Sequence, residues 1–88
     1  MQRSEFIEKV KMASEMMFTI GDIGFTVSEE DEGISIAQWN RQETQKRFKD
    51  AESLANEYMV NGKPIGEQTR EITETFYTGY FELRRLLI

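Results

Sequence analysis

The chain of 88 residues contains no cysteine and no histidine, and it has a single proline. Without cysteine it can form no disulfide, no thiolate metal site and no sulfur nucleophile. Without histidine it lacks the usual general base near neutral pH and the commonest metal ligand of proteins. These absences exclude several kinds of catalytic centre. We therefore expect a protein that is not an enzyme and that carries no catalytic residue, metal or cofactor.

Long hydrophobic runs are also missing. No apolar stretch approaches the roughly 18–20 residues that a membrane-spanning helix needs. The N-terminal stretch, MQRSEFIEKVKMASEMMF, mixes acids with its apolar residues, unlike a secretory signal peptide. We expect a cytoplasmic protein with no membrane partner.

The net charge of −5 is concentrated in one segment. Between Asp22 and Glu32 there are five acids and no base, whereas acids and bases balance over the rest of the chain. A short basic patch follows, formed by Arg41, Lys46, Arg47 and Lys49. This patch is too small for a broad basic face, so we expect no direct nucleic-acid binding. We interpret it as a solvated surface, with a second interpretation as the electrostatic complement of the acidic segment, within one subunit or between two.

The N-terminal segment predicts a helix over residues 4–16, with Ser4 as its N-cap. Phe6, Val10, Ala13 and Met17 recur at helical spacing and define one apolar face. The apolar period then changes to two, which is typical of strands.

Side-chain alternation predicts the register of three strands. A two-residue loop at Gly21-Asp22 and a four-residue loop over 30–33 place all the large apolar residues on one face. These residues are Phe18, Ile20, Ile23, Phe25, Val27, Ile34 and Ile36. A three-residue loop over 31–33 would split this set between the two faces. Alternatively, residues 17–20 extend the first helix and leave only a two-stranded hairpin.

The second half of the chain favours helices. Asn40 and Glu43 suit the N-cap and capping-box positions of a helix over 41–59, which a turn at Asn61-Gly62-Lys63-Pro64 ends. Helical apolar spacing predicts a last helix over 67–86, although threonines and aromatics in this segment also suit a strand. The predicted fold is a single α+β domain over residues 1–88. It has an N-terminal helix, a three-stranded antiparallel β-meander and two C-terminal helices packed on one face of the sheet.

The acidic stretch SEEDEG, residues 28–33, resembles a calcium loop only superficially. If Gly33 occupied the sixth position of an EF-hand loop, Ser28 would stand first and Trp39 would stand where a bidentate glutamate is needed. The stretch is therefore either a solvated hairpin turn or an acidic tip that attracts a basic protein partner. The acidic tip consists of Glu29, Glu30, Asp31 and Glu32.

The predicted last helix suggests a partner-binding surface. Its apolar arc is about 220°, much wider than a one-sided surface helix needs, and the second stripe, formed by Tyr77, Phe81 and Ile88, favours a twofold homodimer. Alternatively, Tyr77 and Phe81 lie flat on the rest of the fold. Trp39 lies on the polar side of its strand and is a further interface candidate, or it packs on the helix expected after it.

These observations favour a small non-catalytic protein-interaction or regulatory protein, homodimeric and of bacterial or phage origin. The alternative is an acidic phage-type inhibitor or nucleic-acid mimic that occupies a basic site on a partner protein; here the similarity lies only in size, charge and mixed architecture. An enzyme that uses carboxylates alone ranks third.

Overall fold

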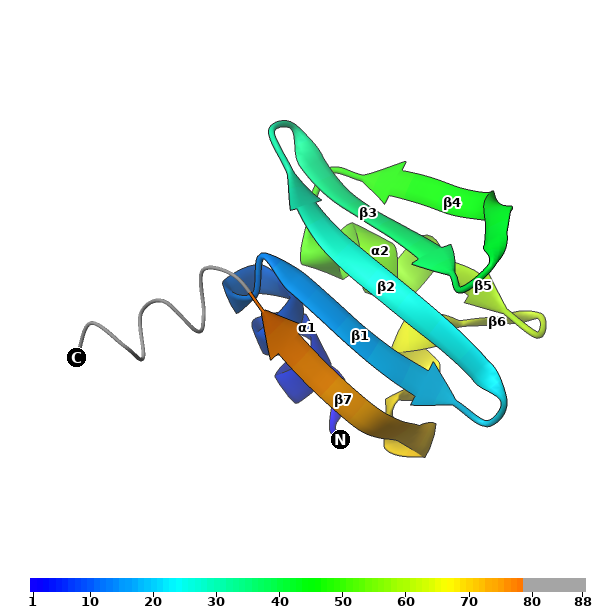
Figure 1. Cartoon of the computed structure of the whole chain (residues 1–88). Coiled ribbons are helices and arrows are strands. Elements are labelled where there is room, and N and C mark those ends of the chain that lie inside the picture. The colour runs from blue at the N-terminus through cyan, green and yellow to red at the C-terminus, as the bar shows by residue number, and fades with distance from the viewer. Residues whose placement is uncertain (79–88) are drawn as a thin grey trace.

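The computed structural model describes residues 1–78, and they form a five-stranded antiparallel sheet with two helices and a small hairpin (Figure 1). In chain order the elements are α1 (Arg3–Met12), β1 (Glu15–Ile20), β2 (Ile23–Glu30), β3 (Gly33–Gln38), β4 (Arg41–Phe48), α2 (Ala51–Glu57), β5 (Met59–Val60), β6 (Lys63–Pro64), the 3-10 turns η1 (Ile65–Glu67) and η2 (Thr69–Glu71), and β7 (Ile72–Thr78). The strand order in the main sheet is β4-β3-β2-β1-β7, so β4 and β7 are its edges.

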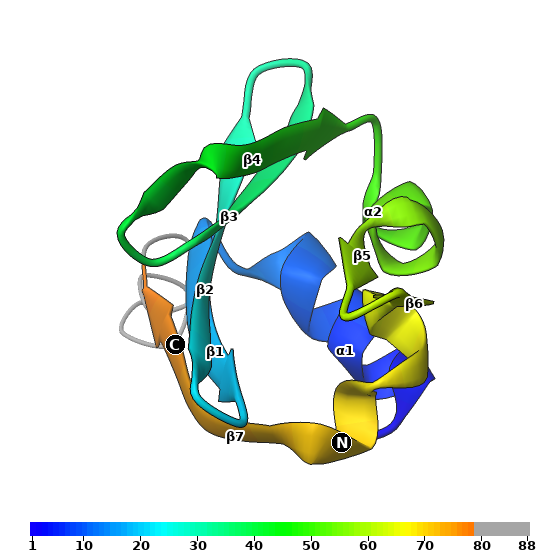
Figure 2. The same cartoon turned by 90° about the vertical axis from the view of Figure 1, so that its right-hand side faces the viewer.

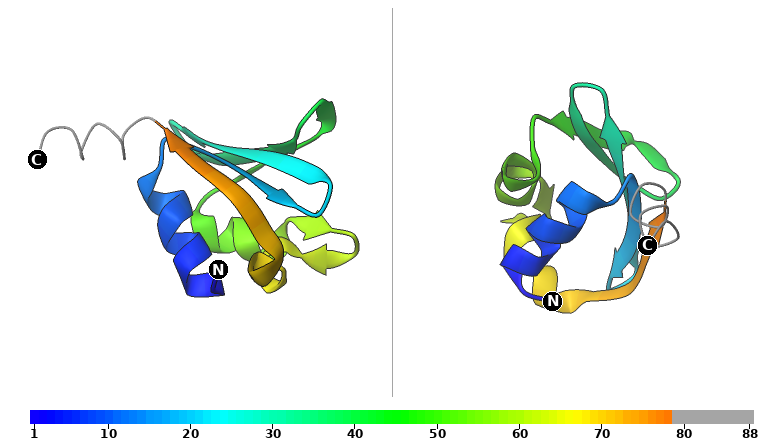
Figure 3. Two further views of the ribbon diagram at one scale, coloured as in Figure 1. Left: turned by 60° about the horizontal axis from the view of Figure 1, so that its bottom comes forward. Right: turned by 90° about the vertical axis from the view of Figure 1, so that its left-hand side faces the viewer.

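Both helices lie on the same face of this sheet. Figure 2 and the right panel of Figure 3 show α1 and α2 on that face, with the β5–β6 hairpin and the 3-10 turns on the same side of the sheet. We call this the inner face and the opposite one the outer face. No described helix covers the outer face (Figures 1 and 2).

The hydrophobic core fills the space between the helices and the inner face. A chain of aromatic rings runs through it: Phe6 of α1 meets Phe18 edge-on at 5.6 Å, and Phe18 stacks on Phe25 at 5.1 Å. Tyr58 then contacts both Phe25 and Phe48 edge-on. Aromatic pairs in these geometries contribute stability beyond the area they bury. The two helices are therefore joined to the sheet through one continuous cluster.

The predicted register of the first three strands is confirmed. Phe18 pairs with Phe25 and Ile20 with Ile23, so residues 17–20 form a strand and do not extend the helix. Val27 pairs with Ile36, as alternation required. The loop is shorter than predicted, because Glu30 and Gly33 pair with each other and leave only two residues in the turn. A two-residue loop keeps the same register as the four-residue loop, since it adds one more pair.

The prediction of a three-stranded meander with two C-terminal helices is wrong. Residues 41–48, expected to begin a helix, form β4, and α2 covers only 51–57. The predicted N-cap, Asn40, has a positive φ of 61° and lies in the tight turn between β3 and β4. The cap of α2 is Asp50, whose carboxylate accepts a hydrogen bond from the backbone N–H of Ser53 at 2.8 Å. The helical apolar spacing begins only at Phe48, so nothing apolar supported a helix before it.

The predicted helix over 67–86 is also wrong for its described part. Residues 65–67 and 69–71 form 3-10 turns, and 72–78 form β7, which pairs with β1. A side-chain hydrogen bond stabilises this pairing: the hydroxyl of Thr19 donates to the backbone oxygen of Thr73 at 2.9 Å. Pairing with β1 satisfies backbone groups that a helix would leave unpaired at the edge of β1. Residues 79–86 lie outside the described residues.

Two smaller corrections concern element ends. The first helix begins at Arg3 and ends at Met12, and Ser4 lies inside it; Gln2 takes the N-cap position without a side-chain hydrogen bond. The segment after α2 was expected to be a plain turn, with a minimal hairpin between Val60 and Ile65 as the alternative. Asn61-Gly62 in fact connects the strands of the β5–β6 hairpin, in which Val60 pairs with Lys63. Both Asn61 and Gly62 have positive φ, and asparagine and glycine are the residues that adopt this conformation most readily in a two-residue hairpin turn.

Candidate interaction surface

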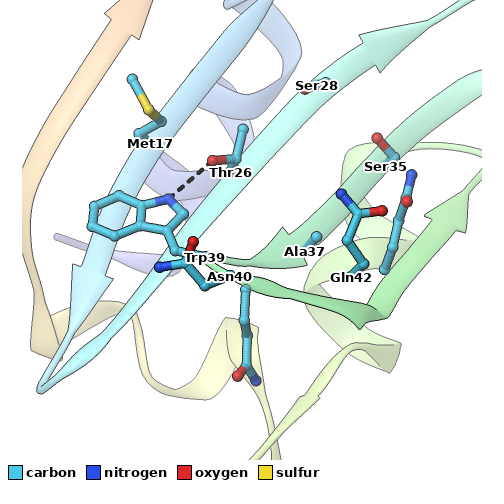
Figure 4. Close-up of a pocket in the computed structure, with 10 residues that line it drawn as sticks. Met17, Thr26, Ser28, Ser35, Ala37, Trp39, Asn40 and Gln42 are labelled. Carbon is cyan, nitrogen blue, oxygen red and sulfur yellow. Dashed lines mark hydrogen bonds between the residues drawn. The ribbon is translucent and has the colours of Figure 1, made fainter.

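The outer face of the sheet carries a shallow hollow of about 450 Å³ (Figure 4). It lies across β1, β2, β3 and β4, on the side away from both helices. Its lining combines one large aromatic side chain with small hydroxyl and amide side chains. The lining residues are Met17, Thr26, Ser28, Ser35, Ala37, Gln38, Trp39, Asn40, Gln42 and Gln45.

Trp39 is the dominant side chain of this surface. It lies in the turn between β3 and β4, and 41% of it is exposed. Its backbone N–H donates to the oxygen of Gly24 at 2.9 Å, and its indole Nε1 donates to Thr26 Oγ1 at 3.0 Å. These two bonds hold the indole over β2, as Figure 4 shows. The sheet itself therefore fixes the position of the side chain.

Gly24 makes room for the indole. A Cβ atom at this position would collide with three carbons of the Trp39 ring, so the ring lies directly on the glycine backbone. An aromatic residue that covers a glycine on the neighbouring strand is a known device of β-sheets. The confirmed register, extended by three pairs beyond Val27 and Ile36, would have placed Trp39 opposite Gly24.

A bulge in β4 brings two amides to the hollow. The register between β3 and β4 shifts after the Ile36–Lys46 pair, and pairing resumes at Gln38 and Arg41. In the bulge, Thr44 Oγ1 accepts from the N–H of Gln38 at 2.8 Å and donates to the oxygen of Arg41 at 2.6 Å.

The consequence concerns Gln42 and Gln45, which are three residues apart. In a regular strand they would point to opposite faces, yet both line the same hollow. The sequence contains no pattern that predicts such a bulge. These two glutamines were therefore missed as candidate site residues.

The hollow is electrically neutral. None of its lining residues carries an ionisable side chain. The carboxyl pKa values of Glu43 and Asp50 are both lowered, chiefly by hydrogen bonds from backbone N–H groups, and burial raises the pKa of the Tyr58 hydroxyl. All three groups lie outside the hollow, so its chemistry is that of hydroxyls, amides and one indole.

The acidic tip lies at the β2–β3 turn, away from the hollow. Glu30 forms an ion pair with Arg47 of β4 at 2.6 Å, whereas Asp31 and Glu32 are exposed in the turn. This contact joins the acidic segment to the basic patch within one subunit, as one interpretation of that patch proposed. Glu30, Asp31, Glu32 and Arg47 also line an open depression. Among the described residues, no group of three or more potential ligands could hold a metal ion.

Of the predicted stripe of Tyr77, Phe81 and Ile88, the structure describes the backbone of Tyr77 alone, and Tyr77 lies in a strand and not in a helix. Tyr77 lies in β7, opposite Met16 of β1, and its side chain lies outside the described part. Phe81 and Ile88 also lie outside the described residues. Trp39 is thus the one residue of the predicted partner-binding set whose side chain the structure places. The element directly after it is β4, so the helix on which it was expected to pack does not begin there.

Within residues 1–78, no helix is long and apolar enough to cross a membrane. No family model, no curated protein and no solved structure matches this chain.

Proposed function

We propose that this chain is a small non-catalytic protein-interaction or regulatory protein that works as a homodimer and engages its partner through the outer face around Trp39. One observation carries the proposal: Trp39 is 41% exposed, yet it is held in place by Gly24 and Thr26. The proposal includes that the protein is cytoplasmic and of bacterial or phage origin.

The energetics of binding support Trp39 as the anchor. Tryptophan is enriched among the few residues that dominate interface energies. A side chain already held in its bound position loses less conformational entropy when a partner docks. The neutral lining supports a binding role over a catalytic one, because general acid–base catalysis needs a titratable side chain near the substrate.

Affinity capture with the full chain tests this function. We expect Trp39→Ala to lose a partner that the native chain retains. Met59→Ala is a matched control, because Met59 is also a large exposed apolar residue, at 51%, but lies on β5, away from the outer face. Equal capture by the native chain and Trp39→Ala would reject the outer face as the binding surface.

Light scattering over a concentration series tests the homodimer. We expect the mass of a dimer at high micromolar concentration. A monomer mass throughout the series would remove the homodimer from the proposal and leave the partner-binding role in place.

A second candidate function is the acidic inhibitor that occupies a basic site on a partner. The exposed carboxylates of Asp31 and Glu32 at the hairpin tip favour it, whereas the Glu30–Arg47 ion pair reduces the negative charge available there. Reversing Glu30, Asp31 and Glu32 to lysine tests it. If the charge-reversed variant still captures the same partners at low salt, the acidic tip is excluded as their binding site.

A further inference from the structure

We propose that the hollow beside Trp39 binds an uncharged, hydroxyl-rich ligand, and specifically a short neutral oligosaccharide. The inference rests on the proposed function insofar as both use the outer face, but it names the chemistry of the ligand. Three features of the hollow point to it: its neutrality, the orientation of the indole, and the amides and hydroxyls that line the rest of it.

Neutrality is the first feature. Charged residues make up 31% of the chain, so a surface of ten residues would ordinarily contain about three. This hollow contains none. A phosphate, carboxylate or ammonium ligand would find no opposite charge to replace its hydration. The lining therefore selects against ionic ligands and suits a polar, uncharged one.

The indole is the second feature. One face of Trp39 lies on the backbone of Gly24, and its ring nitrogen is already bonded to Thr26. The part that remains free is a flat apolar surface (Figure 4). A pyranose ring presents C–H groups on its faces and hydroxyls around its rim, so it can stack on such a surface and keep its hydroxyls directed outward.

The polar rim is the third feature. Asn40 lies next to Trp39, and the amides of Gln42 and Gln45 and the hydroxyls of Ser28 and the largely buried Ser35 line the rest of the hollow (Figure 4). Within the described part of the chain these side chains make no hydrogen bond to another residue. An amide group can both donate and accept hydrogen bonds, and so can a hydroxyl. Each of these side chains can therefore donate to a sugar hydroxyl or accept from one. The hollow is open to solvent, so we expect weak binding, with a dissociation constant of about 1 mM.

Fluorescence gives a direct test, because Trp39 is the single tryptophan of the chain. Neutral hexaoses of glucose (α- and β-linked), xylose, mannose and N-acetylglucosamine are titrated into the full chain to about 10 mM. We expect a saturable change in indole emission with at least one of them. A hexamer of galacturonic acid serves as the charged counterpart, and we expect it not to bind.

Substitutions in the hollow test which residues bind the hexaose. By calorimetry, we expect Trp39→Ala to weaken the active hexaose at least about tenfold and Gln45→Ala about fivefold. Met59→Ala should bind like the native chain. Circular dichroism checks that each variant is folded, and Trp39→Phe, which keeps an aromatic ring, should retain part of the affinity.

The outcomes separate the oligosaccharide inference from the proposed function. If no neutral hexaose gives a saturable signal, or if binding survives both Trp39→Ala and Gln45→Ala, the inference is overturned. If the hexaoses fail while protein capture still depends on Trp39, the surface binds a polypeptide: the proposed function stands and the oligosaccharide inference falls. If a hexaose binds through Trp39 and capture yields no protein partner, the inference stands and the protein-interaction function falls.

Discussion

The two faces of the sheet are made by the same strands, yet they differ in almost every property. On the inner face, Phe18 and Phe25 are fully buried beneath the helices. On the outer face, their neighbours Met17 and Thr26 line an open hollow. Alternation along a strand lets one segment build a core and a surface at the same time. The inner face is therefore specified by the size and burial of its side chains, and the outer face by their chemistry.

The largest expected effect comes from breaking the inner face. Phe18→Ala removes the ring that contacts both Phe6 and Phe25, and we expect it to cost about 3–5 kcal/mol of unfolding free energy. Urea denaturation followed by circular dichroism measures this. Met17→Ala is the matched control, since it is the next residue along β1 and lines the outer hollow; it should cost less than half as much. Similar losses for the two variants would contradict the division between the faces.

Gly24→Ala tests the outer face by displacing its indole. The added Cβ cannot coexist with the present position of the Trp39 ring, so we expect a loss of about 1–3 kcal/mol and a shift of indole emission to longer wavelength. The double variant Gly24→Ala/Trp39→Ala supplies the control. If the collision causes the loss, the double variant should be no less stable than Trp39→Ala alone. A full additive loss would argue against that explanation.

Tyr58→Phe probes the junction between the inner face and the bulged edge. Its hydroxyl donates to the backbone oxygen of Thr44 at 3.2 Å, and losing that bond should cost about 0.5–1.5 kcal/mol. Burial raises the pKa of Tyr58 above its ordinary value of 10.0. The unfolded chain therefore releases this proton first as the pH rises, so this contribution to stability is complete below pH 10 and declines above it.

The measurement for Tyr58 is urea denaturation at about pH 8 and about pH 10.5. The native chain should lose more stability between the two than Tyr58→Phe does. Equal losses in both proteins would show that Tyr58 does not contribute to the alkaline dependence.

The smallest expected effect concerns the edge strand. Arg47→Gln removes the ion pair with Glu30, but both groups are accessible to solvent, so we expect a change below about 1 kcal/mol that shrinks with added salt. Thermal unfolding at low and high salt measures it. A loss as large as that of Gly24→Ala would mean that the β2–β4 contact contributes to the fold as much as the outer face does.

The parts that could be predicted from sequence share a physical cause. Alternating apolar residues from Phe18 to Ile36 admit only one register that buries them together, and that register is present. The same register places Trp39 opposite Gly24, so the centre of the candidate surface was implicit in it. The segment 41–48 offered no comparable signal, because an edge strand with polar residues on both sides shows no alternation.

The order of residues within adjacent strands is enough to specify the inner face, the turn at Gly21-Asp22 and the polar side of the sheet on which Trp39 lies. By contrast, β4 and β7 become strands at opposite edges through hydrogen bonds to β3 and β1, and local propensity does not reveal these partners. Only the tertiary structure places Gln42 and Gln45 in one hollow, because a bulge, not alternation, brings them together.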